Sequence, residues 1–298
     1  MKEISSNRTT KTKIKGLKLF QRRFVKNRLA LLGSIVFAIF LLMSIAPALV
    51  SPRDPYDQDL GSRFTPPFWV RGGTLEHILG RDQLGRDVLG RIIFGTRISI
   101  GVALSSVLFS ILIGVPLGLI SGYFGKGTDT LLMRVVDTML AFPAFVLVLV
   151  TVAVLGPSVL SMIMVIGFVG WASYARLVRG QVLSVRENQY VEACRCLGVG
   201  SFRTMFIHIL PNIVSPLIVF ATFNVARVIL IEAALSFLGL GVQPPTASWG
   251  IMLSEGRQYI YNSIWVSIIP GLAIVFLVLA LNFIGDGIRD ALDMETTL

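Results

Sequence analysis

Few residues of this 298-residue chain could do chemistry, and none forms a catalytic or nucleotide-binding pattern. A phosphate-binding loop needs Gly-x-x-x-x-Gly-Lys followed by Ser or Thr, and the only lysine beyond Lys26 is Lys126, whose neighbours do not fit. The sequence also lacks His-Glu-x-x-His, Gly-x-Ser-x-Gly and paired carboxylates within an apolar segment. We therefore expect no catalytic residue, and ATP hydrolysis linked to this chain would take place on another protein.

The cysteines and histidines do not indicate a metal or cofactor site. Cys194 and Cys196 form a C-x-C pair without further cysteines, and His77 and His208 lie far apart in the chain. Two cysteines are also too few for a disulfide framework. We expect no metal and no cofactor, and we interpret both cysteines as small buried or interfacial residues.

The elements that carry these residues are mostly membrane helices. Hydrophobic residues make up 54% and charged residues 15% of the chain, against about 45–50% and about 25% in soluble domains. About 20 apolar residues are needed to cross a hydrocarbon core of about 30 Å. The sequence therefore predicts an all-α membrane protein with six transmembrane helices. The expected spans are 29–50, 98–124, 138–155, 158–175, 209–231 and 262–285.

The net charge of +10 is concentrated in residues 1–28, which hold ten basic groups and one acidic group. The remaining residues are nearly neutral, so no basic face indicates nucleic acid. The expected cytoplasmic segments carry twice as many basic residues as the outer ones, which predicts cytoplasmic N- and C-termini in a bacterial inner (plasma) membrane. The basic tail is also suited to contact anionic membrane lipid.

These spans predict a domain organisation. It comprises a basic cytoplasmic tail 1–28, a first transmembrane helix 29–50, an extracytoplasmic loop 51–96, a five-helix core 97–288 with a cytoplasmic loop at about 181–211, and a cytoplasmic tail 289–298. The outer loop mixes arginines with acidic residues, and we expect exposed ion pairs there that contribute little to stability.

Four charged residues lie near or within the expected spans. Arg134 and Asp137 are three residues apart, which favours a local ion pair. For Arg227 and Glu232 we expect a solvated position near the outer end of the fifth span, because buried charge in a membrane is costly. The alternative is that they face a translocation path.

The loop between the fourth and fifth expected spans carries the strongest local signals. Residues 186–197 contain no proline or glycine and predict a helix, and Gly198 follows where a left-handed terminal residue would lie. Ser201 could cap a second short helix, and Pro211 suits the first turn of the next long helix. The loop is longer than a simple connector needs, so we expect a helical pair that docks on a partner.

The same loop resembles the "EAA" loop of membrane subunits of ABC importers. Glu192, Ala193 and Gly198, followed by Leu210 and Pro211, match that pattern, in which the loop is a coupling helix that seats in a groove on the ATPase subunit. The sequence His208-Ile209-Leu210-Pro211-Asn212 is similar to the peptide-importer version. The resemblance implies the following ATPase-coupling residues: Glu192, Ala193, Gly198, His208, Leu210 and Pro211.

Two outer segments resemble the same branch of importers. Residues 79–89 are similar to the outer-loop motif of dipeptide and oligopeptide permease C subunits, and residues 235–245 are similar to the motif that follows their fifth span. Residues 133–137 and 141–143 also fit the start of the third span of that family. The resemblance covers nearly the whole chain and implies the type I ABC importer permease fold.

The resemblance implies a non-catalytic permease subunit of an ATP-driven importer of di- or oligopeptides. Its implied partners are two ATP-binding subunits, a second homologous permease subunit that completes the pathway, an extracytoplasmic solute-binding protein and the peptide substrate. The alternatives are an importer of another small solute such as nickel or glutathione, a secondary carrier not driven by ATP, and a membrane scaffold without transport.

Overall fold

The computed structural model describes residues 19–51 and 53–293, and within this part of the chain the regular elements are all helices. Most of the expected basic tail and the last five residues lie outside it. The helices are α2 (Arg28–Ile45), α3 (Pro47–Val50), α4 (Val88–Phe124), α5 (Lys126–Ala141), α6 (Ala144–Leu155), α7 (Val159–Val185), α8 (Gln189–Cys196), α9 (Ser201–Arg203), the π-helical segment η3 (Thr204–Ile209), α10 (Leu210–Phe237), α11 (Trp249–Gly256) and α12 (Trp265–Asp293). Short 3₁₀ turns occupy Leu60–Ser62, Leu75–His77 and Arg257–Tyr259.

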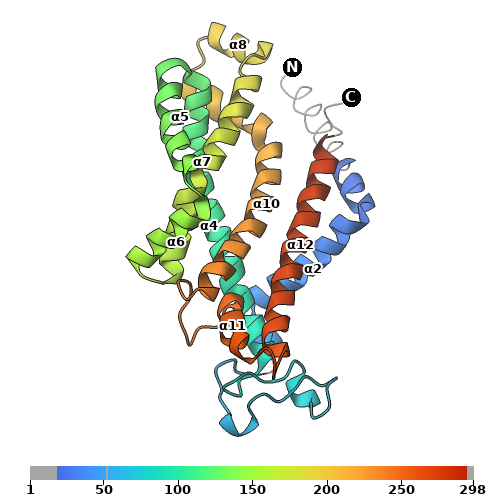
Figure 1. Cartoon of the computed structure of the whole chain (residues 1–298). Helices are drawn as coiled ribbons and strands as arrows, with labels where there is room; N and C mark the ends of the chain where they lie inside the picture. Colours follow the sequence, from blue (N-terminus) through green and yellow to red (C-terminus); the bar gives the residue numbers. More distant parts are fainter. Residues whose placement is uncertain (1–18, 52, 294–298) are drawn as a thin grey trace.

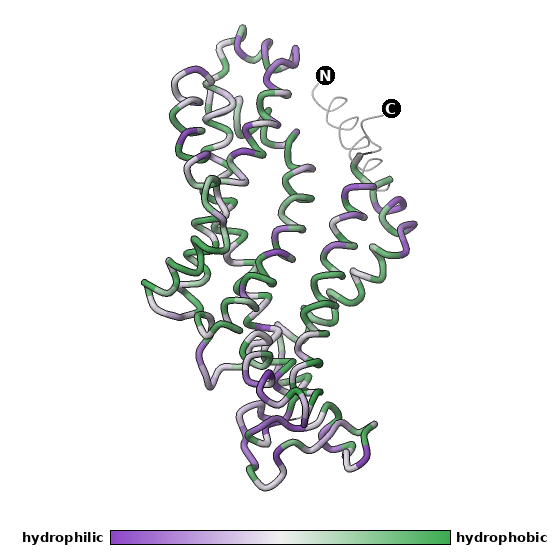
Figure 2. Tube along the Cα trace, in the orientation of Figure 1, coloured by the Kyte–Doolittle hydropathy of each residue, from purple (hydrophilic) through white to green (hydrophobic). Residues whose placement is uncertain are grey.

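Long helices run between two ends of the molecule, which Figure 1 shows at the top and the bottom. We call them the α8 end, where α8 lies, and the loop end, formed by residues 53–87 with the neighbouring segment 238–264. Apolar residues predominate along the helices between them, and hydrophilic residues gather at both ends (Figure 2). The start of α2 and the end of α12 lie toward the α8 end.

The structure confirms an all-helical fold with up to six membrane spans. Among the described residues, α2, α4, α7, the run from Ser201 to Phe237 and α12 are each long and apolar enough to cross a membrane. The sixth span requires α5 and α6 together, which bend by 83° where they meet. Pro143 lies at this break and has no N–H to continue the helix, which explains why the expected span 138–155 is not one straight helix.

The second long helix begins ten residues before the expected span, at Val88 rather than Ile98. Asp87 caps it, because its carboxylate accepts a hydrogen bond from the N–H of Gly90 at 2.7 Å. With 37 residues, α4 is about 55 Å long and exceeds the hydrocarbon core. The sequence-based boundary failed here because Arg91 and Arg97 lie within the helix, where only an apolar run was expected.

The closest pair of helices, α4 and α7, meets along a stripe of small residues. Gly114, Gly118 and Gly122 recur every four residues on one face of α4. A Cβ at Gly114 would lie 2.5 Å from the carbonyl oxygen of Trp171, and one at Gly118 would lie 2.6 Å from that of Ala175. The stripe therefore lets the two backbones approach closely, as small residues do in membrane helix pairs.

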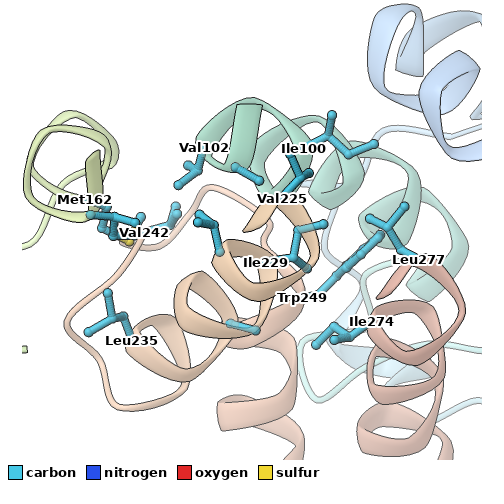
Figure 3. Close-up of a cluster of buried hydrophobic side chains, with 14 of the residues drawn as sticks. Ile100, Val102, Met162, Val225, Ile229, Leu235, Val242, Trp249, Ile274 and Leu277 are labelled. Carbon is cyan, nitrogen blue, oxygen red and sulfur yellow. The ribbon is translucent and has the colours of Figure 1, made fainter. Parts of the chain in front are cut away.

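The main hydrophobic core lies between α4, α7, α10, α11 and α12, and α6 packs at its side. Figure 3 shows Trp249 of α11 among Ile100 of α4, Ile229 of α10 and Leu277 of α12. Trp249 is fully buried, and its indole N–H donates to the carbonyl of Ile92 at 3.0 Å. Because one side chain contacts three spans and satisfies its polar atom, α11 is fixed against the membrane helices.

Candidate functional site

The expected coupling loop begins with α8, whose C-terminus has the geometry that the sequence predicts. Gly198 has φ +71°, and the N–H of Val199 donates to the carbonyl of Cys194 at 3.0 Å. The N–H of Gly198 donates to the carbonyl of Arg195, also at 3.0 Å. These two bonds form a Schellman motif, in which glycine takes the left-handed position at no steric cost.

The chain then continues as one helical run from Ser201 through η3 into α10. Ser201 was expected to cap this run, and that prediction is wrong, because Gly200 occupies the cap position and no side chain caps the helix. The π-helical segment carries its hydrogen bonds over five residues, as from the N–H of Leu210 to the carbonyl of Met205. Pro211, which has no N–H, follows directly in the first turn of α10, as predicted.

A small core holds α8 against the membrane helices. Val191 is the one buried residue of α8, and it packs with Met205 and Ile209 of η3. The same cluster contains further residues of α4, α7 and α10: Val115, Leu119, Val178, Val182 and Ile213. The position of α8 is thus coupled to three long helices through a single apolar anchor.

The opposite side of this helical pair presents apolar side chains to the surroundings. Leu197 is 82% exposed, Phe202 is 70% exposed and Ile207 is 57% exposed. Glu192 and Ala193 are also exposed, on α8. We call these five residues the α8 face. Exposed apolar residues grouped with a charge are typical of a surface that another protein covers.

The six residues implied by the resemblance fall into two groups. Glu192, Ala193 and Gly198 are exposed in or next to α8, whereas His208 and Leu210 are half-buried beneath it and Pro211 is exposed one turn further along. Leu210 packs against the core around Val191. The first group can contact a partner, and His208 and Leu210 are placed to support it.

Sequence reasoning missed the apolar members of the α8 face and the anchor Val191. The signal available was weak, because α8 has only eight residues and its single buried position is flanked by polar ones. Leu197 and Phe202 lie on either side of the Gly198 turn, where apolar side chains are not needed for packing between helices. That position was the one sequence feature that could have indicated them.

A polar cavity of about 520 Å³ lies between α8 and the junction of α4 and α5. Glu192 lines it, together with Tyr123, Phe124, Gly125, Lys126, Arg186, Glu187 and Arg195. The guanidinium of Arg195 lies over the ring of Tyr123, 5.0 Å from its centre, and Arg186 donates to the carbonyl of Gly122 at 2.9 Å. Charged side chains of α7 and α8 thus meet the end of α4 beneath the α8 face.

Ion pairs join α5 to α7 near this end. Arg179 donates two hydrogen bonds to the carboxylate of Asp129, at 2.5 and 2.6 Å. Asp137 pairs with Arg176 of α7 and not with Arg134, so the expected local pair is wrong. Because α5 packs on α7, Arg176 of α7 lies close to Asp137 of α5 and pairs with it. The sequence spacing had indicated a partner on the same helix as Asp137.

The prediction of a solvated Glu232 is also wrong. Glu232 is fully buried between α4 and α10, and it accepts hydrogen bonds from Ser99 at 2.8 Å and from Ser236 at 2.9 Å. Hydroxyl donors replace the water that the sequence reasoning expected around this carboxyl group. Arg227, five residues earlier, is exposed in the single chain and lines a cavity.

The expectation of exposed ion pairs fails for the centre of the loop end. Asp82 accepts hydrogen bonds from Arg86 at 2.7 Å and from Arg91 at 2.6 Å. Glu255 of α11 accepts from the same two arginines, both at 2.8 Å, and from Gln83 at 2.9 Å. Asp82, Arg86 and Arg91 are buried. The Arg-Asp pairs at residues 81–82 and 86–87 thus help to tie the loop to α4 and α11. The sequence did not indicate this, because Glu255 lies far along the chain from the loop.

The fold is similar to that of a chain from a solved ABC transporter. A chain of the MetNI methionine ABC transporter, solved in inward-facing conformations, superposes with a TM-score of 0.56, covering 68% of this chain and 97% of that one. Its sequence identity is 19%, so the likeness concerns the fold.

The family follows from sequence comparison. The model of the binding-protein-dependent transport system inner membrane component matches residues 114–297, and that of the N-terminal transmembrane domain of oligopeptide transport permease C matches residues 17–67. The chain belongs to the family of binding-protein-dependent transport system inner membrane components, and it is a multi-pass inner-membrane protein.

Curated relatives match over nearly the full length. The di/tripeptide transport system permease protein DppC of Pseudomonas aeruginosa is 44% identical over 93% of this chain and 91% of its own length. The dipeptide transport system permease protein DppC of Haemophilus influenzae is 44% identical over 91% of this chain and 92% of its own length. That of Escherichia coli is 43% identical over 93% and 92%, respectively.

Proposed function

We propose that this chain is a permease subunit of an ATP-driven importer of di- or oligopeptides, and that it couples to an ATPase subunit through the α8 face. One observation carries the proposal: apolar and charged side chains are exposed together on a short helical pair that is anchored to three membrane helices. The names of the relatives support peptides as the solute, because each of the three is a di- or tripeptide permease protein.

In this proposal the α8 end faces the cytoplasm, with both termini, and the loop end faces outward. The excess of basic residues in the segments at the α8 end supports this orientation. The partners would be two ATP-binding subunits at the α8 end, a second permease subunit beside the helices, and a solute-binding protein at the loop end. ATP hydrolysis would take place on the ATP-binding subunits, and this chain would be non-catalytic.

The continuous helical run supplies a physical route for coupling. Ser201–Phe237 contains 37 residues, which gives a lever about 55 Å long. An ATPase subunit that displaced α8 would move η3 through Val191 and Met205, and α10 would follow because no break separates it from η3. Because α4 and α7 lie in close contact along the glycine stripe, these two helices would move together.

The test is Glu192→Ala in the assembled transporter, reconstituted with its partner subunits. Loss of a charge contact with the ATPase subunit should reduce both peptide uptake and peptide-stimulated ATP hydrolysis about tenfold or more. The matched control is Asp286→Ala, which removes an exposed carboxylate of α12, outside both α8 and the loop end. Wild-type uptake and stimulated hydrolysis in the Glu192→Ala transporter would show that this residue does not couple.

Two alternatives remain distinguishable by uptake measurements. A secondary carrier would take up its solute in response to a proton gradient without ATP. An importer of another small solute, such as nickel or glutathione, would hydrolyse ATP in response to that solute and not to peptides. The sequence identity to peptide permease proteins favours an ATP-driven peptide importer over both alternatives.

A further inference from the structure

A cavity between the helices is lined by polar groups, of which Ser110 and Asn224 donate to backbone carbonyls of the fold and Arg227 forms no ion pair among the described residues. It has a volume of about 230 Å³ and lies between α4, the α5–α6 break, α7 and α10. Its walls are mostly apolar, with Val107, Val148, Ile166 and Val228 among them. The polar groups at its surface are Ser110, Ser173, Tyr174, Asn224 and Arg227. Apolar walls with a few convergent polar groups are typical of ligand sites.

Arg227 is the principal charged group at this cavity. It lies ten residues before the end of α10, about 15 Å along the helix axis. Among the described residues, its guanidinium forms no ion pair. An arginine within a membrane span is costly, and such residues commonly face a cavity and mark a substrate path. Its five N–H donors can therefore serve a ligand.

Tyr174 provides an independent observation from a second helix. Its side chain is 1% exposed and lines the cavity, yet its hydroxyl has no hydrogen-bond partner in the part of the chain that the structure describes. A buried hydroxyl without a partner costs free energy, because it has given up its bonds to water. The hydroxyl has almost no accessible surface, so a ligand group in the cavity reaches it only when the side chain turns toward the cavity. The hydrogen bond then formed would offset that cost.

The break between α5 and α6 adds a third donor group. Ala144, the first residue of α6, and Phe142 line the cavity. No side chain caps this helix of 12 residues, so its first N–H groups are not satisfied within the helix. The N-terminus of a helix attracts negative charge, and half-helices in transporters often direct this end toward anionic groups of the substrate.

We propose that this cavity binds the terminal carboxylate of a peptide during translocation, with Arg227 as the ion-pairing residue and Tyr174 as a hydrogen-bond donor. The cavity is smaller than the approximately 300–1,000 Å³ of sites for whole drug-sized ligands, so it suits one end of a peptide. A carboxylate matches the bidentate geometry of a guanidinium. This inference rests on the proposed function, because it takes the transported solute to be a peptide.

The test compares two probes in the complete transporter, reconstituted in liposomes with ATP and its solute-binding protein. Uptake is measured for dialanine and for dialanine amide, which lacks the carboxylate. Arg227→Gln should reduce dialanine uptake about tenfold or more and change amide uptake less than about twofold. Arg227→Lys keeps the charge, so its dialanine uptake should fall less than that of Arg227→Gln. Tyr174→Phe should reduce dialanine uptake about two- to fivefold. Selectivity of the binding protein is common to all variants and cancels in the comparison.

Arg97→Gln is the matched control, because it removes an exposed arginine of α4 that does not line the cavity. Its uptake ratio of dialanine to dialanine amide should equal that of wild type. An unchanged ratio in Arg227→Gln, or equal loss of both probes in a complex with wild-type basal ATP hydrolysis, would overturn the inference. If that variant does not assemble, unchanged ratios in both Arg227→Lys and Tyr174→Phe would overturn it. Failure of the wild-type complex to import dialanine and longer alanine peptides would instead refute peptide import and, with it, this inference.

Discussion

The two ends of the helix bundle differ in how they place charged side chains. At the loop end, Asp82 and Arg91 are 0% and 1% exposed and bind one another within the protein. At the α8 end, Leu197 and Phe202 are 82% and 70% exposed, and Glu192 is exposed beside them. Buried charges at the centre of the loop end bind one another within the protein, whereas the charge of the α8 face is exposed. We therefore propose that the centre of the loop end is a fixed structure and that another protein covers the α8 face.

The largest expected effect comes from breaking the loop end. Arg91→Met removes a buried partner of both Asp82 and Glu255, and it should lower the free energy of unfolding by about 3 kcal/mol, because carboxylates stay buried with fewer donors. Denaturant titration of the purified subunit in micelles measures this loss. Arg53→Met, which removes an exposed ion pair with Glu76, is the control and should unfold like wild type. Equal stability of the two variants would contradict the account of this end.

The α8 face should respond in the opposite sense, with lost binding and retained stability. Leu197→Ser and Phe202→Ser should each weaken binding of the ATPase subunit about tenfold or more, since apolar side chains at the centre of an interface contribute most. Their unfolding should match wild type, because both residues are exposed in the free subunit.

Leu238→Ser is the control for that binding experiment. Leu238 is 53% exposed and follows α10 at the loop end. Its ATPase affinity should be unchanged, as measured by co-purification or by titration of the reconstituted subunits. Similar losses for Leu238→Ser and Phe202→Ser would mean that the α8 face is not a specific contact.

The turn after α8 should have a smaller effect. Gly198 has φ +71°, so Gly198→Ala should cost about 1–2 kcal/mol locally although no heavy atom lies within 4 Å of the added Cβ. Gly200 also has open space around it but has φ −58°, so Gly200→Ala should be close to neutral. Hydrogen exchange of the α8 amides compares the two variants. Faster exchange in Gly200→Ala than in Gly198→Ala would refute the role of the turn.

The smallest expected effect is a dependence of the loop end on pH. Burial alone would raise the pKa of Glu255, but the charges and hydrogen bonds of Arg91 and Arg86 outweigh burial and hold the pKa below its ordinary value of 4.5. A lowered pKa stabilises the fold above the ordinary value, and this contribution is lost as the pH falls through the folded-state pKa. Unfolding measured between neutral and acidic pH should show this loss, and Glu255→Gln should reduce it. An unchanged pH dependence in that variant would contradict the assignment.

The sequence predicted local features better than contacts between distant segments. The Gly198 turn and the place of Pro211 were confirmed, because each depends on a few neighbouring residues. Glu232, Asp137 and Arg86 were misjudged, because their partners Ser99, Arg176 and Glu255 lie 133, 39 and 169 residues away in the chain. A sequence pattern carries no information about which distant donor will satisfy a buried carboxylate.

The candidate sites divide in the same way. The position of the coupling loop followed from a motif within one stretch of chain, whereas Val191, Leu197 and Phe202 were recognised only from their burial and exposure. Arg227 was identified as unusual for a membrane span, yet the cavity that it shares with Tyr174 needs three helices and a helix break. The α5–α6 bend of 83° is a tertiary feature that Pro143 permits but does not specify.

The central claim, that the α8 face binds an ATPase subunit, can be tested directly at a native residue. Cys196 is exposed at the end of α8, beside Leu197. In a Cys194→Ser background, the rate of maleimide labelling of Cys196 is measured for the subunit alone and for the assembled transporter. Labelling should be at least about tenfold slower in the assembly, because the ATPase subunit covers α8. Equal labelling rates would contradict this claim.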